Sequence, residues 1–309
     1  MVFMKTPELA APAGCAESLK AAVESGADAV YMGLDQFNAR MKADNFDMDS
    51  LPRWADYVHA HKAKLYLAFN TLIKQSELDG AARLAAAAFE KGADALIMQD
   101  LGLVKAVRES NPNIVIHAST QMGVHNTEGA RAVKAMGIAR AVLSRETPLK
   151  DIAEIAKTGL ETEVFVHGAL CVSFSGNCYF SALVSGYSGN RGRCMQLCRK
   201  KYKAVLPHGG IKTGMPPPSA RRERVINDGY LLSPCDLCLA RELRSLADAG
   251  VASFKIEGRM RRPQYVKETV RIYKKALAGT LDDRDTDALN AVEHARGGIK
   301  IDYLHGERQ

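Results

Sequence analysis

The cysteines of this 309-residue chain are concentrated in one part of the sequence. Six of the seven fall between residues 171 and 238, at Cys171, Cys178, Cys194, Cys198, Cys235 and Cys238. Free cysteine usually packs as a small buried hydrophobe, which would scatter the thiols through the core. Six gathered thiols instead predict a soft-metal site, because thiolates select zinc, copper(I) or iron–sulfur clusters.

The spacing of the cysteines leaves the kind of metal open. Cys194-x₃-Cys198 and Cys235-x₂-Cys238 are compatible with two short chelating loops around zinc. Cys171-x₆-Cys178 is too loose for such a loop, whereas an iron–sulfur cluster tolerates longer spacings. Spacing alone therefore favours iron–sulfur over zinc, and zinc over structural or redox-active thiols.

Composition predicts a protein of the reducing cytoplasm. The chain is 47% hydrophobic, enough for a full core. The N-terminus has no apolar run typical of a signal peptide. No stretch reaches the ~20 apolar residues needed to span a bilayer. In that compartment clustered cysteines favour metal binding or catalysis over disulfides.

The net charge of +7 is distributed unevenly. Basic residues cluster beside the cysteines and again at Lys255, Arg259, Arg261 and Arg262. This clustering predicts a polyanion or a carboxylated small molecule as partner, although a solvated basic surface would look the same. Aromatic residues make up only 6% of the chain, so no stacking platform for single-stranded RNA is expected.

Eight short apolar segments alternate with helical patterns and predict an α/β fold. The predicted strands are residues 8–12, 29–33, 64–70, 95–99, 114–118, 139–144, 163–167 and 252–257. Their number predicts a TIM-like (β/α)₈ barrel, and a doubly wound sheet is the alternative. No glycine-rich nucleotide-binding loop supports that alternative.

The regular alternation breaks once, after the seventh strand. We predict a barrel over residues 1–280, a cysteine-rich basic insertion over 168–230 and a polar C-terminal tail over 281–309. A helix over 236–249 should restore the alternation before strand eight. Loops after the strands form the active face of such barrels, so the insertion should place its cysteines over the barrel mouth.

One segment has a highly specific sequence, Glu163-Val-Phe-Val-His-Gly-Ala-Leu-Cys171 with its continuation to Ser181. Further distinctive segments are residues 9–14, 26–33, 38–40, 190–199, 236–238 and 253–259. Together these segments span nearly the whole chain, and they resemble peptidase family U32, the collagenase-like proteases.

The family name implies proteolysis, but the members with clearer biochemistry are oxygen-independent hydroxylases that carry a [4Fe–4S] cluster on four cysteines. They modify a tRNA uridine, a ribosomal cytidine or the ubiquinone ring, and prephenate is the expected oxygen source in several of these pathways. The resemblance implies Cys171, Cys178 and Cys194 as ligands. Cys238 is the first choice for the fourth ligand and Cys198 the second.

Other site residues are expected at strand ends on the loop side. Candidate catalytic residues are His167, Glu257 and Asn70, with the first two suited to proton transfer. Candidate substrate-binding residues are Asn38, Arg40, Arg145 and Arg259, whose guanidinium groups suit carboxylates or phosphates. Each could instead anchor a loop, and a buried structural role is the stronger expectation for His167.

We therefore expect an iron–sulfur enzyme that hydroxylates a base of tRNA or ribosomal RNA, with prephenate as a candidate co-substrate. One alternative is a peptidase that uses Cys171 or a metal-bound water as nucleophile. Another is a ubiquinone-ring hydroxylation subunit acting with a paralogous U32 partner. Many family members continue into a small C-terminal β domain for which this sequence has no room, and this makes RNA a less secure substrate.

Overall fold

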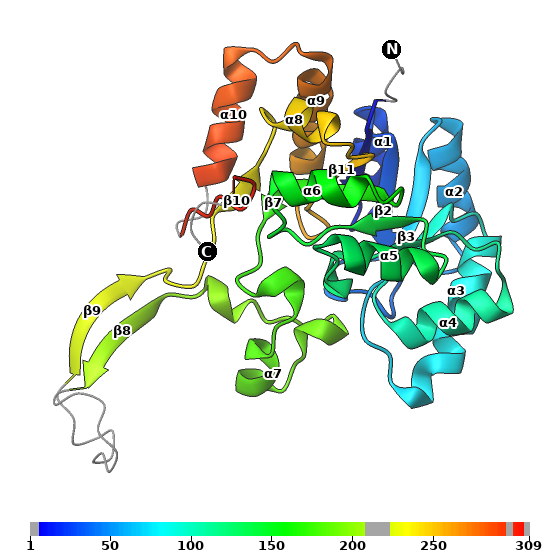
Figure 1. The fold of residues 1–309 in the computed structure, drawn as a ribbon, viewed down its shortest axis with the longest axis horizontal. Coiled ribbons are helices and arrows are strands. Elements are labelled where there is room, and N and C mark those ends of the chain that lie inside the picture. Colours follow the sequence, from blue (N-terminus) through cyan, green and yellow to red (C-terminus); the bar gives the residue numbers. More distant parts are fainter. Residues whose placement is uncertain (1–5, 208–222, 295–298, 306–309) are drawn as a thin grey trace.

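A closed parallel barrel forms the centre of the protein (Figure 1). The computed structural model describes residues 6–207, 223–294 and 299–305. The barrel strands are β1 (Glu8–Pro12), β2 (Ala29–Gly33), β3 (Lys64–Phe69), β4 (Ala95–Met98), β5 (Ile116–Ala118), β6 (Arg140–Val142), β7 (Glu161–Ala169) and β11 (Ser253–Ile256). The strands pair in this order, and β11 closes the ring onto β1. The predicted (β/α)₈ barrel is confirmed.

Amphipathic helices surround the barrel and bury one face each against it. They are α1 (Ala16–Glu24), α2 (Leu51–Ala60), α3 (Leu78–Glu90), α4 (Leu101–Ser110), α5 (Thr127–Ala135), α6 (Leu149–Ala156), α8 (Leu243–Asp248) and α9 (Pro263–Ala278). Outward-facing strand residues such as Leu65, Leu67 and Leu96 are fully buried beneath this layer. The main hydrophobic core therefore lies between the strands and the helices.

The barrel interior is partly polar near the N-terminal ends of β6 and β7. The Glu163 carboxylate accepts hydrogen bonds from Lys255 Nζ at 2.6 Å and Arg140 Nη1 at 3.2 Å. Burial alone would raise the pKa of Glu163, but these two cations outweigh burial and bring it to about 2. A buried carboxylate is tolerated here because it is both paired and hydrogen-bonded.

The insertion after β7 folds into short helices and a hairpin. These are η3 (Phe174–Gly176), α7 (Phe180–Ser185), η4 (Gly189–Arg191), η5 (Leu197–Arg199) and the antiparallel pair β8 (Tyr202–Pro207) and β9 (Glu223–Gly229). The hairpin projects away from the barrel (Figure 1). The proline-rich segment 215–218 lies outside the described residues.

The helix predicted over 236–249 is wrong in its first part. Residues Asp236–Cys238 form a strand, β10, that pairs antiparallel with β7, and α8 begins only at Leu243. Because β6 pairs only with Glu161–Glu163, the last part of β7 offers an open edge that β10 occupies. This pairing partner is distant in sequence, so local periodicity did not indicate it.

The segment predicted as a polar tail packs against the barrel. It contains α10 (Asp283–His294), whose buried Asp285 pairs with Arg271 and Lys275 of α9. Further on, Leu304 is buried and its carbonyl accepts the Leu149 N–H. The division of the chain into domains stays a prediction.

Candidate functional site

A cavity of about 430 Å³ lies at the C-terminal mouth of the barrel, under the insertion. Strand-end residues including Asn70, Arg145 and Glu257 form its barrel side. The insertion contributes the thiols of four cysteines, Cys171, Cys178, Cys194 and Cys198. The expectation that the insertion brings cysteines to the barrel mouth is therefore met.

The four thiols in the cavity are free and are partly surrounded by hydrogen-bond donors. The Phe180 N–H donates to Cys178 Sγ and the Gln196 N–H to Cys194 Sγ, each at 3.4 Å. Cys171 Sγ lies 3.1 Å from the Ser173 hydroxyl. Hydrogen bonds of this kind stabilise thiolates and tune iron–sulfur clusters.

The cavity offers the ligand chemistry of a cluster site, because iron–sulfur clusters are held by cysteine thiolates and four cysteines line it. Across the described ranges, no group of three His, Cys, Asp or Glu side chains is placed to hold a single metal ion. Burial raises the pKa of the Cys198 thiol, Arg199 lowers it, and Cys171, Cys194 and Cys178 raise it further, so these three thiols lie within electrostatic reach of Cys198.

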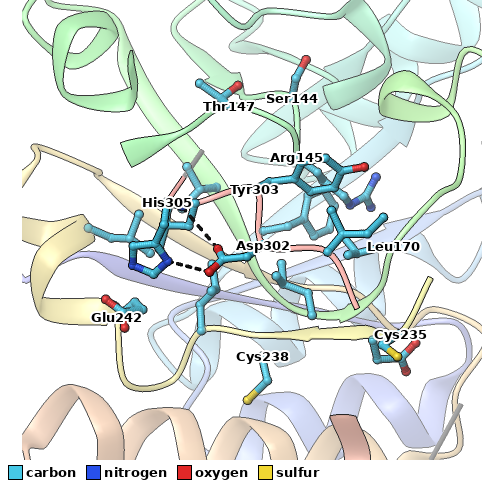
Figure 2. A pocket seen from close by; sticks show the side chains of 18 of the residues that line it. Ser144, Arg145, Thr147, Leu170, Cys235, Cys238, Glu242, Asp302, Tyr303 and His305 are labelled. Carbon is cyan, nitrogen blue, oxygen red and sulfur yellow. Dashed lines mark hydrogen bonds and ion pairs between the residues drawn. The ribbon is translucent and has the colours of Figure 1, made fainter. Parts of the chain in front are cut away.

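Cys238, the first choice as fourth ligand, does not lie with the other three. It lines a second cavity of about 230 Å³ together with Cys235 (Figure 2). The Tyr273 hydroxyl lies 3.9 Å from its sulfur. In Figure 2 the Cys238 side chain extends below strand β10, while Leu170 and Tyr303 lie above this strand. The pairing of β10 with β7 sets the direction of the Cys238 side chain. Cys198, the second choice as fourth ligand, lines the same cavity as Cys171, Cys178 and Cys194.

Buried polar contacts hold the cysteine loops in place. Glu146 accepts hydrogen bonds from both the N–H and the hydroxyl of Ser175, midway between Cys171 and Cys178. Ser175 has a φ of 43°, a strained conformation for a residue other than glycine. Arg199, next to Cys198, donates to the carbonyls of Leu170 and Pro234. Local sequence patterns do not indicate these contacts, because the partners are distant along the chain.

The barrel side of the cavity is cationic. Arg40 Nη2 lies 3.1 Å from Glu257 Oε1, and the Arg145 guanidinium lies 3.9 Å from the Phe165 ring centroid. Burial alone would raise the pKa of Glu257, but Arg40, Arg145 and Arg259 outweigh burial and hold that pKa below its usual value. Three guanidinium groups facing one carboxylate leave the site positive and suited to an anion.

The two asparagines predicted as site residues, Asn70 and Asn38, form hydrogen bonds with residues of the loops in this structure. Asn70 Oδ1 accepts the Ala39 N–H at 2.9 Å, and Asn38 Oδ1 accepts from Arg259 Nη1 at 3.1 Å. Asn38 is fully buried, whereas Asn70 also lines the cavity. A Cβ added to Gly14 would collide with the Arg259 carbonyl oxygen, so the close packing behind Arg259 requires glycine.

His167 does not reach the cavity. It is 1% exposed, and its Nδ1 lies 3.2 Å from the Tyr273 hydroxyl, on α9 outside the barrel. The register between β7 and β11 shifts at this point. Phe165 pairs with Lys255, but the next residue of β11, Ile256, pairs with His167, so β7 advances by two residues where β11 advances by one. This bulge reverses the side-chain alternation and turns His167 outward. The proposed catalytic role of His167 does not fit this position.

The buried His167 should instead make stability depend on pH. Burial, assisted by Arg261, lowers its pKa to about 4, against an unperturbed value of about 6.5. The unfolded chain then binds a proton on His167 more readily than the folded protein does. The contribution of neutral His167 to folding stability is therefore full above pH ~6.5 and is lost as the pH falls toward 4. We expect the urea midpoint to fall over this range, and to fall less steeply for His167→Gln. Equal slopes for the two proteins would contradict the assignment.

The chain belongs to peptidase family U32, whose model matches residues 14–305. It is 37% identical to "Uncharacterized protease MJ0090" of Methanocaldococcus jannaschii over 93% of this chain and 69% of that protein. It is also 37% identical to the "23S rRNA 5-hydroxycytidine C2501 synthase" of Escherichia coli, over 90% of this chain and 40% of the relative. The "tRNA hydroxylation protein P1" of Bacillus subtilis is 33% identical, with coverages of 89% and 64%. The chain thus spans between two fifths and about two thirds of these relatives.

No helix in the described part of the chain is long and apolar enough to cross a membrane.

Proposed function

We propose that this protein carries an iron–sulfur cluster and catalyses hydroxylation of an RNA base without molecular oxygen. The observation that carries the proposal is the convergence of four cysteines and five arginines, Arg40, Arg145 and Arg259 among them, on one cavity at the barrel mouth. Cys171, Cys178 and Cys194 would hold the cluster, and the placement of the sulfurs favours Cys198 over Cys238 as the fourth ligand. The names of two relatives, an rRNA 5-hydroxycytidine synthase and a tRNA hydroxylation protein, support the reaction and the substrate class.

Hydroxylation replaces a ring C–H bond with C–OH and removes two electrons from the base. In this proposal a hydroxyl-bearing donor supplies the oxygen atom and accepts those two electrons, exchanging its own C–OH for C–H, so that the step balances without a further oxidant. Prephenate is the candidate donor, and its two carboxylates would suit the cationic wall of the cavity. The cluster would supply one-electron transfer beside the reacting ring.

The residues of the cavity have separate tasks in this proposal. Arg145, Arg40 and Arg259 would hold carboxylate or phosphate oxygens by charge-assisted hydrogen bonds. Because the pKa of Glu257 is held low, its carboxylate is ionised at neutral pH and would accept a proton rather than donate one. The apolar ring of Phe165 would help to exclude water from the site.

The peptidase alternative lacks a nucleophile with a base. The hydrogen-bond partner of Cys171 is the Ser173 hydroxyl, and His167 points out of the barrel. The described lining of the cavity includes no histidine. A cysteine nucleophile needs such a base to be activated.

Quinone-ring hydroxylation with a paralogous partner stays a prediction. The cytoplasmic location of the protein also stays a prediction.

Deleting the gene is expected to remove one hydroxylated nucleoside from total tRNA or ribosomal RNA. Liquid chromatography with mass spectrometry of digested RNA measures this loss, and the native gene on a plasmid should restore the nucleoside. An unchanged nucleoside profile with an altered quinone profile would move the assignment to quinone-ring hydroxylation. Cleavage of gelatin by the protein, abolished by Cys171→Ala, would establish the peptidase instead.

A further inference from the structure

In the described part of the chain, the exposed aromatic rings belong to the insertion. Among the described residues, the exposed Phe, Tyr and Trp side chains are Phe174, Tyr179, Tyr187 and Tyr230. Tyr179 is 73% exposed, Phe174 54% and Tyr187 48%. Most of the other rings pack into the core or against it, so the exposed rings belong to one segment of the chain. Exposed aromatic rings concentrated in one place are typical of binding surfaces.

The same insertion is rich in positive charge that carboxylates do not balance. From residue 164 to 222 the sequence contains no Asp or Glu, but nine Lys and Arg. Arg193, Lys200, Lys201 and Lys203 are exposed, and none of them forms an ion pair with a described residue. Cations left unpaired in a group attract a polyanion.

Contacts link this surface to the opening of the cavity. The Met195 N–H donates to Ser181 Oγ of α7 at 2.8 Å, and Lys42 Nζ lies 3.2 Å from Met195 Sδ. The ring centroids of Phe180 and Tyr202 are 6.3 Å apart, which joins α7 to the base of the hairpin. Lys42 and Phe180 both line the cavity. Met195 directly follows Cys194, so this part of the insertion borders the cavity that contains the thiols.

We infer that this surface binds unpaired RNA nucleotides next to the cavity. We call it the insertion face and define it by Phe174, Tyr179, Tyr187, Arg193, Lys200 and Lys201. Bases would stack on its rings while the cations contact the phosphates. A duplex hides the faces of its bases and would engage only the cations. The inference rests on the proposed function and adds that the substrate is read in a loop or single strand.

A protein partner is the competing occupant, because Leu183 and Val184 of α7 are also exposed. The charge of the face favours RNA. A second copy of this chain, with its net charge of +7, would be repelled by the unpaired cations. Stacking on exposed rings together with cations beside them is the pattern of single-strand binders.

Fluorescence anisotropy of the full chain, loaded with its cluster, tests this inference. The probe is a labelled single-stranded oligoribonucleotide of about 12 nucleotides, compared with the same strand annealed to its complement. We expect tighter binding of the single strand. Tyr179→Ala should weaken it about tenfold, while Tyr179→Phe, which keeps the ring, should bind like the native protein.

Salt dependence separates the rings from the cations. Arg193→Ala should reduce the slope of log K against log salt by about 0.7, as expected for one lost phosphate contact on a single strand. Tyr179→Ala should leave the slope unchanged. Arg244→Ala is the matched control, because Arg244 is 95% exposed on α8, in a different part of the fold.

Three results would overturn the inference. They are equal binding of single strand and duplex, native-like binding by Tyr179→Ala, and conversion of a dimer to a monomer by Leu183→Glu without any change in RNA affinity. In each case the nucleoside lost on gene deletion is a separate measurement. If that nucleoside disappears while Tyr179→Ala binds normally, the insertion face is rejected and the proposed function stands.

Discussion

Replacing Cys178 with serine is expected to reduce the iron and acid-labile sulfide of anaerobically purified protein from about four of each per chain to near zero. Cys178 lies in the cavity with Cys171, Cys194 and Cys198, and its sulfur accepts the Phe180 N–H. A hydroxyl is a harder and poorer ligand for iron than a thiolate. The measurements are metal analysis, sulfide assay and the absorption band of the cluster.

Cys15→Ser is the matched control for this experiment. Cys15 lies just before α1, and its thiol donates to the Ser18 hydroxyl at 3.3 Å. Its variant should keep full iron. Comparing Cys198→Ser with Cys238→Ser identifies the fourth ligand, and the structure predicts loss only for the first. Stoichiometric zinc without sulfide, in protein never exposed to air, would reject the cluster altogether.

Arg145→Leu is expected to lower the hydroxylated nucleoside about 10- to 100-fold, the size of a lost hydrogen bond to a charged group. Arg145 lies on the barrel side of the cavity, stacked on Phe165, and the described residues offer its guanidinium no hydrogen-bond partner. Its donors are therefore available for a carboxylate or phosphate. Nucleoside analysis of a deletion strain that expresses the variant gives the measurement.

Two comparisons keep this prediction specific. Iron content should match that of the native protein, because Arg145 is not a ligand. Arg145→Lys should fall between the native protein and Arg145→Leu, because an ammonium keeps the charge but loses the bidentate fork. Native-like nucleoside levels in Arg145→Leu would exclude a role for Arg145 in substrate binding, whether or not the cluster is present.

The barrel could be predicted from the sequence because each of its units is local. A buried parallel strand reads as a short apolar run, and each following helix shows its own period. The predicted strands therefore agree with the observed ones to within about two residues, as for β1 and β2, whose bounds match throughout. The position of the cysteine-rich insertion followed directly from the break in this alternation.

The candidate site was only partly readable in this way. The sequence placed Cys171, Cys178, Cys194, Arg145 and Glu257 on the loop side of the strands, and the structure brings them to one cavity. It did not indicate the contacts by which Glu146 and Arg199 anchor the cysteine loops, because their partners lie far away along the chain. It also missed the exposed rings, because a low aromatic content says nothing about which aromatic residues reach the surface.

The sequence by itself determined the barrel, the insertion and the group of thiols, since all three follow from residue type and local spacing. Only the tertiary structure decided where His167 and Cys238 point. A bulge between β7 and β11 turns His167 out of the barrel, and the pairing of β10 with β7 carries Cys238 away from the cavity. Both depend on registers between strands distant in sequence, and a shift of one residue moves a side chain to the opposite face.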